Sequence, residues 1–361
     1  MPDTKLIINL VDQYSKVNFG IWHAAIATAE ALKIQHGIDT MLVAPRTKKP
    51  FDAKRFPFVQ FQSVEDLSLS GAEVFFSQWD PKTTVIATHG TWQFPTRWGA
   101  EARKQGFRWI YTPHGMLEPW SMSQKWLKKR LYFEFAEKPM ARKADWVRAV
   151  GSPEEVNLKK HFKQVKLIPN AVYATDLLDL PRPATPTRFL YLARLHHKKG
   201  ILPLVEAWKT SLLWKNADYQ LNIAGTDDGE QAKLEKFLSE NPGGNIHFLG
   251  PQFGADKTKL LKESHYYILP SLSEGFPTSV LEAMAAGLVP VITKGCNFPE
   301  SLAKNLALET YTSTSEISQT LDEILQITEA ERLAKAIQCQ AFVKENYVWD
   351  QIAAMQAELV K

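Results

Sequence analysis

Residues 269–287 read LPSLSEGFPTSVLEAMAAG and contain the local signals of a strand end, a turn and a helix. The apolar run 266–269 predicts the strand, a glycine and a proline predict the turn, and an apolar helical period begins at about Thr278. Glu274 lies in the turn, and Glu282 lies about one turn inside the predicted helix. The free N–H groups and the positive end of the helix dipole point beyond the carboxyl end of the strand. The stretch therefore predicts an anion site flanked by two carboxylates.

A ligand with phosphates at its centre and hydroxyl groups at both ends fits such a site, and a nucleotide sugar has that shape. The simpler alternative is that Glu274 is a solvated loop acid and Glu282 an ordinary helical residue. The surrounding residues favour the first interpretation. The pattern E-G-F-P-x-x-x-L-E-A-M-A-A-G, followed by VPVIT at 289–293, closely resembles the E-x7-E signature of retaining GT-B glycosyltransferases, known as glycosyltransferase family 4.

This resemblance implies a fold and a set of donor contacts. The fold implied is α/β with the GT-B architecture, in which two doubly wound Rossmann-like domains face a central cleft. Glu282 is expected to accept hydrogen bonds from the ribose hydroxyls, and Glu274 from hydroxyls of the transferred sugar. Further donor contacts are expected from the turn and the helix start, namely Gly275, Phe276, Thr278, Ser279 and Val280.

The size and composition of the chain agree with this architecture. Its 361 residues are too many for one ordinary core, and 45% apolar and 23% charged residues are values of globular proteins. Two cysteines form neither a disulfide framework nor a metal motif, which predicts a reducing compartment. The first residues are typical of a first strand rather than a signal peptide, and no stretch reaches the ~18 apolar residues of a spanning helix. We expect a cytoplasmic protein, either free or attached peripherally to the inner face of the cell membrane.

Strand-like and helix-like runs alternate along the chain, which is typical of parallel sheets with helices on both faces. Strands are predicted at 6–11, 41–44, 84–87, 108–112, 146–150, 188–192, 220–224, 246–249, 266–269 and 288–292, and the first helix at 21–35. A stretch rich in proline and short polar residues predicts the linker between two domains. The predicted organisation is an N-terminal acceptor-binding domain at 1–170, the linker at 171–187, a C-terminal nucleotide-sugar-binding domain at 188–343, and a last helix at 344–361. The resemblance implies that this last helix packs on the N-terminal domain.

The loop after the strand at 188–192 carries a second motif. Residues 191–200, YLARLHHKKG, resemble the family's G-R-L-x-x-x-K-G element, with alanine where the first glycine is usual. A guanidinium and an ammonium group across a turn can neutralise a diphosphate and the charge that develops on it as it leaves. The resemblance gives this role to Arg194 and Lys199, whereas Lys198 is a rival whose spacing is one residue short. The alternative is a solvated basic loop.

Two further strand ends resemble family elements that surround the nucleotide. Residues 221–229, LNIAGTDDG, match a strand followed by a glycine-rich turn, which places Gly225 at the donor. Residues 245–252, NIHFLGPQ, resemble a strand and turn whose backbone reads the base, although a proline removes one donor. The base contacts are expected from Leu249, Gly250 and Pro251.

Two His-Gly pairs follow strands of the first half, His89-Gly90 and His114-Gly115. A histidine in such a place is more often structural than functional. The second pair lies in YTPHGMLEPW, residues 111–120, and resembles the family's H-G element, whose histidine approaches the donor sugar and the reacting centre. The resemblance carries that role to His114, with Gly115 beside it at the cleft. His89 is a candidate for acceptor contacts.

A glycine pair usually follows the first strand in the family and lets the backbone approach the phosphates and the acceptor. Residues 17–21, VNFGI, retain one of the two, Gly20, and have Phe19 in place of the other. Gly20 is therefore a candidate cleft residue.

The positive charge of the chain is concentrated in one segment. The net charge is +4, but residues 125–143 hold seven basic and two acidic side chains, so the rest of the chain sums to −1. Aromatic residues and leucines lie between these charges, which is typical either of a helix on an anionic membrane surface or of a solvated helix with a core-facing stripe. Nucleic acid is disfavoured because no nucleic-acid-binding motif accompanies the patch. The candidate membrane or acceptor patch comprises Lys125, Trp126, Lys128, Lys129 and Arg130.

Several motifs are absent from the sequence: a P-loop, a dinucleotide fingerprint, H-E-x-x-H, C-x-x-C and a nucleophile elbow. Asp227 and Asp228 are adjacent rather than spaced as D-x-D, so they do not predict a metal site. No cofactor is expected either. The expected donor substrate is a UDP-sugar.

The motifs together predict a retaining, metal-independent hexosyltransferase. It would move a sugar from a UDP-sugar to a hydroxyl of a glycan, which in the family is often lipid-linked, in the synthesis of a cell-surface or extracellular polysaccharide. No carboxylate is placed as a covalent nucleophile, so attack on the same face as the leaving phosphate is expected. The alternatives are a soluble-acceptor transferase of the sucrose-phosphate-synthase type, a GT-B sugar-nucleotide epimerase or hydrolase, and a nucleotide-binding scaffold with a vestigial site.

Overall fold

The computed structural model describes residues 4–15, 18–47, 51–179 and 185–360. The chain divides into two compact units, and each is described by itself. Unit 1 comprises Met1–Ala171 and Trp349–Lys361, and unit 2 comprises Val172–Val348.

The predicted linker at 171–187 only partly lies in the described chain, because residues 180–184 are outside it. The residues before this gap already belong to unit 2. Val172 forms an isolated parallel bridge with Val348, and Leu178 packs against the core of unit 2. The chain thus passes from unit 1 to unit 2 directly after Ala171.

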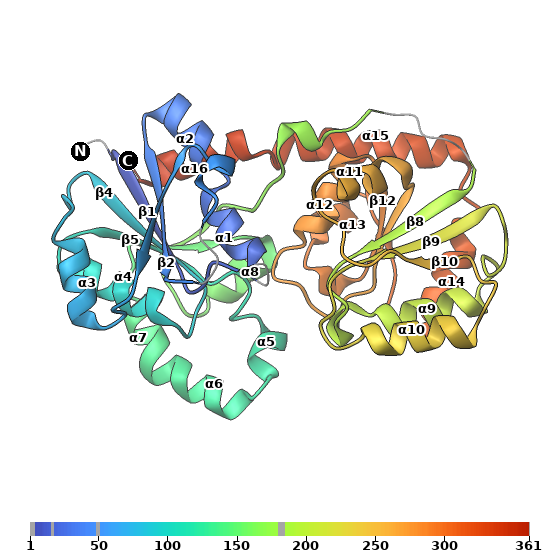
Figure 1. The fold of residues 1–361 in the computed structure, drawn as a ribbon, viewed down its shortest axis with the longest axis horizontal. Coiled ribbons are helices and arrows are strands. Elements are labelled where there is room, and N and C mark those ends of the chain that lie inside the picture. The colour runs from blue at the N-terminus through green and yellow to red at the C-terminus, as the bar shows by residue number, and fades with distance from the viewer. Residues whose placement is uncertain (1–3, 16–17, 48–50, 180–184, 361) are drawn as a thin grey trace. The chain divides into compact units, whose positions relative to one another are not determined.

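Unit 1 is built on a seven-stranded sheet with the order β3-β2-β1-β4-β5-β6-β7 (Figure 1). All its neighbouring strands are parallel. The strands are β1 (Leu6–Val11), β2 (Asp39–Pro45), β3 (Val59–Val64), β4 (Thr84–His89), β5 (Arg108–Thr112), β6 (Trp146–Ala149) and β7 (Val165–Leu167). Central strands such as β1, LIINLV, are apolar almost throughout because they are buried on both faces. The strand order reverses between β1 and β4, and ligands of such sheets bind at the carboxyl ends beside this reversal.

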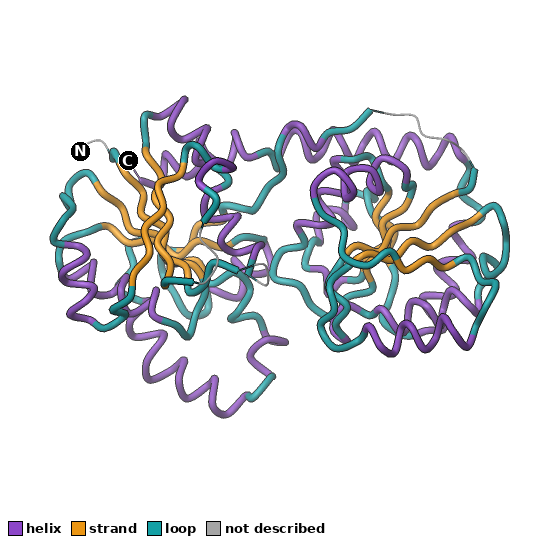
Figure 2. Tube along the Cα trace, in the orientation of Figure 1, coloured by secondary structure: helices purple, strands orange, loops and turns teal. Residues whose placement is uncertain are grey.

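Helices cover both faces of this sheet (Figure 2). They are α1 (Phe19–Ile26), α2 (Ala29–His36), α3 (Leu69–Phe76), α4 (Phe94–Lys104), α5 (Pro119–Ser123), α6 (Trp126–Tyr132), α7 (Lys138–Ala141), α8 (Ser152–Leu158) and α16 (Trp349–Val360). The pleat sends alternate side chains to opposite faces. Ile8 and Ile86 therefore pack with α3 and α4, whereas Ile7 and Val85 pack with α2 and α16.

The single helix predicted at 21–35 is wrong, because the chain forms α1 and α2 there with a break between them. The backbone leaves the helical region at Thr28, with φ −91° and ψ 0°. The Thr28 hydroxyl donates to Oε1 of Gln356 on α16 at 2.7 Å. This tertiary contact lies at the break, and the apolar period of the sequence does not reveal it.

Unit 2 is built on a six-stranded parallel sheet with the order β10-β9-β8-β11-β12-β13. Its strands are β8 (Thr187–Leu192), β9 (Tyr219–Ala224), β10 (Ile246–Phe248), β11 (Tyr266–Leu269), β12 (Val289–Ile292) and β13 (Leu308–Glu309). Its helices are α9 (Ile201–Thr210), α10 (Gln231–Glu240), α11 (Gly254–Glu263), α12 (Thr278–Ala285), α13 (Pro299–Ala303), α14 (Thr314–Ile324) and α15 (Glu329–Asn346). The strand order reverses between β8 and β11.

The core of unit 2 is one continuous apolar cluster that joins the sheet to its helices. Its largest fully buried side chains include Phe189 and Tyr191 of β8, Trp208 of α9 and Tyr267 of β11. Helices again lie on both sides of the strands (Figure 2). The predicted fold class, α/β with two doubly wound Rossmann-like units, is confirmed.

Candidate active site

Two loops that leave neighbouring strands of unit 2 carry the main sequence motifs. The first follows β8 and runs through a 3₁₀ turn, His197–Lys199, into α9, and the second follows β11 and leads into α12. The two loops are bonded to each other, because the Lys198 carbonyl accepts hydrogen bonds from the Leu272 N–H (2.8 Å) and the Ser271 hydroxyl (3.1 Å). They leave the sheet beside the reversal of its strand order, where ligands of doubly wound sheets bind.

Lys199 and Glu274 form a buried ion pair between these two loops. Nζ of Lys199 lies 2.7 Å from Oε1 and 2.6 Å from Oε2 of Glu274, and the two side chains are 15% and 9% exposed. The attraction is strong where water is excluded, and a charge left alone at this position is correspondingly costly. The sequence predicts each residue as part of the site, but it does not predict that they contact each other. The rival Lys198 contributes its carbonyl to the loop contact described above.

Main-chain contacts hold Glu274 in place. Its N–H donates to the Gly295 carbonyl at 2.7 Å, and its own carbonyl accepts from Nδ2 of Asn297 at 2.5 Å. A Cβ atom at Gly295 would lie 2.5 Å from the Leu272 carbonyl oxygen, so a side chain there would force the backbone apart. The carboxylate of Glu274 is thus aimed by a loop with little freedom to move.

The first turn of α12 begins at Thr278, as predicted, but it offers fewer donors than the sequence suggests. The N–H groups of Thr278 and Val280 donate to the carbonyls of Phe276 (3.0 Å) and Pro277 (2.9 Å). The Val280 side chain is buried in the core, so neither its side chain nor its N–H is available for the predicted donor contact. The Ser279 N–H, by contrast, meets no acceptor among the described residues.

Two other predicted side chains also face inward. The Phe276 ring lies 6.0 Å from that of Phe298 and 6.1 Å from that of Tyr347, within the aromatic part of the core. The Tyr267 hydroxyl donates to the Leu192 carbonyl at 3.0 Å, and the Ser279 hydroxyl lies 2.8 Å from the same Tyr267 oxygen. Because a carbonyl can only accept, the Ser279 hydroxyl donates to Tyr267. These contacts fix the start of α12 against β8 and β11.

Arg194 and Glu282 each have a partner of opposite charge that the sequence analysis did not select. Nη1 of Arg194 lies 2.6 Å from Oδ2 of Asp228, with both side chains substantially exposed. Nζ of Lys257, on α11, lies 2.6 Å from Oε1 of Glu282, with both side chains partly exposed. The neighbouring Asp227 instead accepts N–H groups at the start of α10. The site therefore contains three cation–carboxylate pairs, of which Lys199–Glu274 is the most buried.

Gly225 allows two turns of unit 2 to touch. A Cβ atom there would lie 1.8 Å from the Ala193 carbonyl oxygen, so the position requires glycine. The Gly225 N–H donates to the Gly250 carbonyl at 3.0 Å, and the Leu249 N–H donates to the Ile223 carbonyl at 2.8 Å. The predicted base-reading turn thus uses part of its backbone to extend the sheet. The Gly250 N–H has no acceptor among the described residues, and the predicted contact of this turn with a base stays a prediction.

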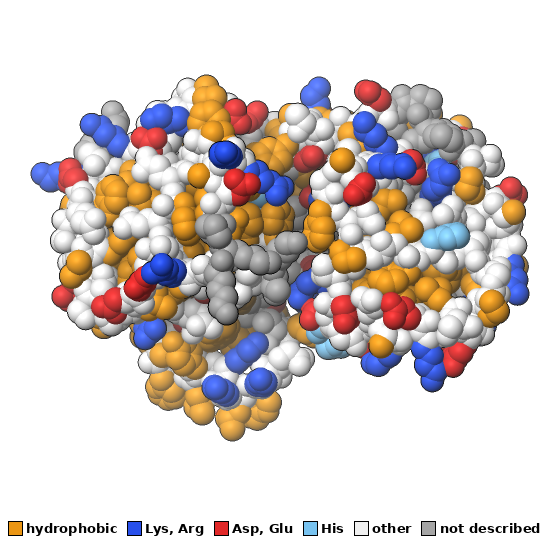
Figure 3. All heavy atoms as spheres, viewed as in Figure 1, with side chains coloured by type: hydrophobic (Ala, Val, Ile, Leu, Met, Phe, Trp, Pro, Cys, Tyr) orange, Lys and Arg blue, Asp and Glu red, His pale blue; other side chains and the backbone are white. Residues whose placement is uncertain are grey.

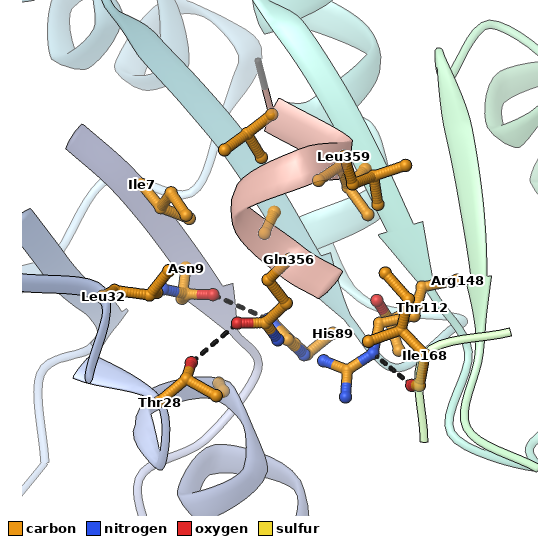
Figure 4. Close-up of a pocket in the computed structure, with 14 residues that line it drawn as sticks. Ile7, Asn9, Thr28, Leu32, His89, Thr112, Arg148, Ile168, Gln356 and Leu359 are labelled. Carbon is orange, nitrogen blue, oxygen red and sulfur yellow. Dashed lines mark hydrogen bonds between the residues drawn. The ribbon is translucent and has the colours of Figure 1, made fainter. Parts of the chain in front are cut away.

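In unit 1, His89 and His114 lie next to each other at the ends of β4 and β5. Nδ1 of His89 is 2.9 Å from Nε2 of His114. Nε2 of His89 is 3.0 Å from Oδ1 of Asn9 (Figure 4). Burial, with help from the charge of Arg148, lowers the pKa of both rings, that of His114 to about 3. His89 is 2% exposed and both of its ring nitrogens are engaged, so the prediction that it contacts an acceptor is wrong. It supports His114 instead.

The turn that carries His114 is tightly held. His114 has φ +53° and Gly115 has φ +73°, which is the left-handed region that L side chains adopt at a cost. The Gly115 N–H donates to Oε1 of Glu154 at 2.6 Å, and the Val150 N–H donates to Oε2 at 2.8 Å. Burial raises the pKa of the Glu154 carboxyl to about 7. Gly115 therefore serves the turn through its N–H, and Glu154 is a supporting residue that the sequence analysis did not select.

Gly20 is the second residue of α1, and a Cβ atom there would meet no atom of the described chain within 4 Å. It faces open space rather than a neighbouring backbone. The position leaves room for a ligand, and the predicted role of Gly20 stays a prediction.

The basic segment forms α6, a π-helical turn (Phe133–Glu137) and α7. Its outward face is apolar: Trp126, Leu127, Leu131 and Phe135 are 50–80% exposed, and Phe133 is buried. Figure 3 shows hydrophobic and basic side chains gathered over α6. An open groove of about 340 Å³ runs along this face, lined by Trp126, Leu127, Arg130, Leu131, Glu134 and Phe135. A helix that is merely solvated would present polar residues there instead.

No three His, Cys, Asp or Glu side chains of the described residues come together so that they could hold a metal ion. Every helix found among these residues is too short or too polar to cross a membrane.

Comparison with known proteins identifies the motifs of unit 2. The family model described as "Glycosyl transferases group 1" matches residues 176–340. The chain is 26% identical over 200 residues to the phosphatidylinositol N-acetylglucosaminyltransferase gpi3 subunit of Schizosaccharomyces pombe, a match that covers 53% of this chain and 42% of that protein. It is 34% identical over 109 residues to the N,N'-diacetylbacillosaminyl-diphospho-undecaprenol alpha-1,3-N-acetylgalactosaminyltransferase of Campylobacter jejuni, covering 30% of this chain and 27% of that protein. The chain thus spans less than half the length of these curated relatives.

The fold is similar to that of solved GT-B enzymes. The crystal structure of Anabaena Alr3699/HepE in complex with UDP and glucose superimposes with a TM-score of 0.74 at 17% identity and covers 99% of both chains. At this identity the likeness establishes the fold, two Rossmann-like units of the GT-B type, and leaves the substrates open.

Proposed function

We propose, on the premise that residues 176–340 match the family model of the group 1 glycosyl transferases, that the protein transfers a hexose from a UDP-sugar to a hydroxyl group of a glycan, with retention of the anomeric configuration. The observation that carries the proposal is the buried Lys199–Glu274 pair where the strand order of unit 2 reverses. A cation and a carboxylate side by side suit two adjacent parts of one ligand: Lys199 binds a phosphate, and Glu274 accepts a hydrogen bond from a hydroxyl of the sugar attached to it.

The chemistry follows from the charge of the leaving group. As the bond between the sugar and the phosphate breaks, negative charge grows on the diphosphate. Lys199 and Arg194 stabilise this charge, and the Ser279 N–H with the positive end of the α12 dipole adds to it. Arg194 is half-exposed, so it can exchange Asp228 for a phosphate at low cost. The acceptor hydroxyl attacks the face from which UDP departs, and a phosphate oxygen takes its proton, which gives retention without a covalent nucleophile or a metal ion.

The comparisons support the two substrates in this proposal. The Anabaena structure contains UDP and glucose, which supports a UDP-hexose as donor. The names of the two relatives contain phosphatidylinositol and diphospho-undecaprenol, both lipids, and this supports a lipid-linked acceptor.

Donor binding is tested by thermal unfolding with UDP-hexoses. A ligand at about 100 times its Kd stabilises the folded state by about 2.7 kcal/mol, so the melting temperature of the wild-type protein is expected to rise by several degrees. Arg194→Ala removes charge-assisted hydrogen bonds to the diphosphate and is expected to weaken binding about 10- to 100-fold, which removes from about half to nearly all of the rise. The matched control is Lys236→Ala, which breaks an exposed ion pair on the same unit and should leave the rise unchanged. A full rise in Arg194→Ala would contradict the assignment.

Product analysis then separates the enzymatic alternatives. Incubation with a UDP-sugar alone should release little sugar, whereas an epimerase or hydrolase would convert the donor without an acceptor. With an acceptor present, the new bond should have the anomeric configuration of the donor sugar, and inversion would refute the proposed mechanism.

We also propose that the α6 face docks on an anionic membrane, where a lipid-linked acceptor resides. Exposed Trp126 and Phe135 can enter the interface between headgroups and acyl chains, while Lys128 and Arg130 pair with lipid phosphates. The acid on this face, Glu134, is neutralised by Lys138 at 2.7 Å, so the local charge stays positive.

Co-sedimentation with vesicles tests this contact. Binding to phosphatidylcholine vesicles that contain phosphatidylglycerol is expected, and it should weaken as salt is added. Loss of two basic side chains at the membrane surface reduces the free energy of membrane binding by about 2 kcal/mol. Lys128→Glu/Arg130→Glu should therefore bind the vesicles at least ~30-fold more weakly. The control Lys236→Glu/Lys259→Glu makes the same change of charge at exposed positions of unit 2 and should bind normally. Equal losses in both variants would show that net charge, and not the α6 face, governs binding.

A further inference from the structure

Three polar side chains form a linear hydrogen-bonded chain inside unit 1. Asn9 lies in β1, His89 ends β4, and His114 follows β5. The hydrogen-bonded side chains therefore lie where the strand order reverses, between β1 and β4. The contacts are 3.0 Å between Oδ1 of Asn9 and Nε2 of His89, and 2.9 Å between Nδ1 of His89 and Nε2 of His114. Asn9 and His89 are buried, and only His114 is partly exposed. The chain therefore leads from the interior of the sheet to an accessible ring.

The amide of Asn9 sets the direction of this chain. Its Nδ2 donates to the Met41 carbonyl at 3.3 Å, which can only accept. Oδ1 of Asn9 is therefore the atom that faces His89, and it too can only accept. It follows that Nε2 of His89 carries a hydrogen.

The surroundings of His89 keep its ring neutral. A buried cavity of about 30 Å³ borders Asn9 and His89, and the Arg148 side chain also lines it (Figure 4). Arg148 is 3% exposed, and its guanidinium donates to the Ile168 and Pro169 carbonyls at 2.8 and 3.1 Å, so it stays a cation. A second positive charge beside it, in a space that excludes bulk water, is strongly disfavoured. With Nε2 protonated and the ring neutral, Nδ1 of His89 can only accept, and the hydrogen in its contact with His114 belongs to Nε2 of His114.

We infer that Asn9 and His89 are positioning residues that hold His114 as its Nε2–H tautomer, so that Nδ1 of His114 accepts, and never donates, a hydrogen bond from a ligand. No described residue bonds to Nδ1 of His114, and the side chain is partly exposed. A hydroxyl group is the ligand chemistry that such a nitrogen selects. That this hydroxyl belongs to the sugar rests on the proposed function, whereas the tautomer does not. His114 thus orients a hydroxyl and is not a proton donor in the reaction.

The turn geometry serves the same end. Because His114 has φ +53° and its neighbour Gly115 is tied to Glu154, the backbone fixes the point from which the His114 side chain extends toward His89. The backbone thus sets where the side chain begins, and the hydrogen bond to His89 sets both the orientation and the tautomer of the ring.

The tautomers are tested by two-dimensional NMR of protein labelled with ¹⁵N in its histidine rings. Long-range ¹H–¹⁵N correlations at pH 7 distinguish Nε2–H, Nδ1–H and doubly protonated rings, and the His89→Gln and His114→Gln spectra assign the two signals. Both rings of the wild-type protein are expected to be pure Nε2–H tautomers. An Nδ1–H or charged His114 would overturn the inference, and the tautomers are read from the wild-type protein without any substrate.

Variants then test which residues set the tautomer. Asn9→Leu removes the acceptor for His89, and His89→Leu removes the acceptor for His114, so His114 should become a mixture of tautomers in both. His89→Gln keeps an acceptor oxygen for His114 and a donor for Asn9, and it should restore the pure form. Asn222→Leu removes a comparably buried asparagine from a strand of unit 2 and should leave both signals unchanged. Unchanged tautomers in Asn9→Leu and His89→Leu would overturn the inference.

Kinetics connect the tautomer to the reaction. Asn9→Leu weakens one oriented hydrogen bond to the substrate and is expected to lower kcat/KM about 10-fold, and His89→Gln should lose much less activity than His89→Leu. An intact NMR pattern with no transferase activity in the wild-type protein would refute the proposed function and leave the tautomer assignment standing. Full activity in Asn9→Leu with mixed tautomers would show that the tautomer has no part in the reaction.

Discussion

Lys199→Met is expected to lower kcat by about 10²- to 10³-fold and to reduce the free energy of unfolding by about 3–5 kcal/mol. The rate falls because the departing diphosphate loses its most buried cation. The stability falls because Glu274, 9% exposed and fixed by its loop, keeps a carboxylate without a counter-charge. Urea unfolding at 10 °C and a UDP-release assay measure the two effects.

The double variant Lys199→Met/Glu274→Leu separates these effects. Removing both charges leaves no unpaired charge in the buried site, so most of the lost stability should return, while kcat should stay at least as low as in Lys199→Met. A conservative surface control is Lys236→Met, which breaks an exposed pair and should change neither quantity measurably. If the double variant were as unstable as Lys199→Met, the pair would not be the source of the stability loss.

Gly200→Ala is expected to destabilise the protein by about 2–4 kcal/mol and to abolish donor binding. Gly200 directly follows Lys199 and has φ +71°, where a side chain alone costs about 1 kcal/mol. A Cβ atom there would also lie 2.3 Å from the Pro270 carbonyl oxygen. Because Pro270 begins the loop of Glu274, relief of this overlap must move the two site loops apart and stretch the ion pair between them.

A glycine elsewhere in unit 2 isolates the steric part of this effect. Gly243 has φ +75°, and a Cβ atom there meets nothing within 4 Å. Gly243→Ala should therefore lower the free energy of unfolding by about 1 kcal/mol and leave UDP-hexose binding intact. Thermal unfolding with and without donor measures both. Equal losses in the two variants would show that the close approach of Gly200 to Pro270 is unimportant.

The central strands could be predicted from the sequence because burial on both faces gives continuous apolar runs. The strand predicted at 6–11 is β1, and that at 266–269 is β11. Three strands were missed, β3, β7 and β13, and each is the short or half-exposed strand at an edge of its sheet. An edge strand is only partly buried, so its sequence, such as VQFQSV in β3, lacks the continuous apolar run of a central strand.

The candidate site could be predicted as a set of motifs but not as a set of contacts. Glu274, Lys199 and Arg194 lie in loops whose sequence patterns are recognisable. Which charge meets which depends on the paths of those loops, and no spacing along the chain reports that Lys199 bonds Glu274 or that Asp228 bonds Arg194. Asn9 gave no signal because a single polar residue inside an apolar strand has no partner until the sheet brings β4 and β5 beside it.

The position of α16 has a consequence for synthesis of the chain. Ile352, Ala353 and Ala357 are fully buried in unit 1, although all of unit 2 separates them from the rest of that unit in sequence. On the ribosome, contiguous unit 2 can close its core while unit 1, translated first, still exposes the apolar surface that α16 covers. Such a surface invites misassembly or chaperone binding until residues 349–360 have been made. The part of the protein that is made first is therefore the part that reaches its native state last.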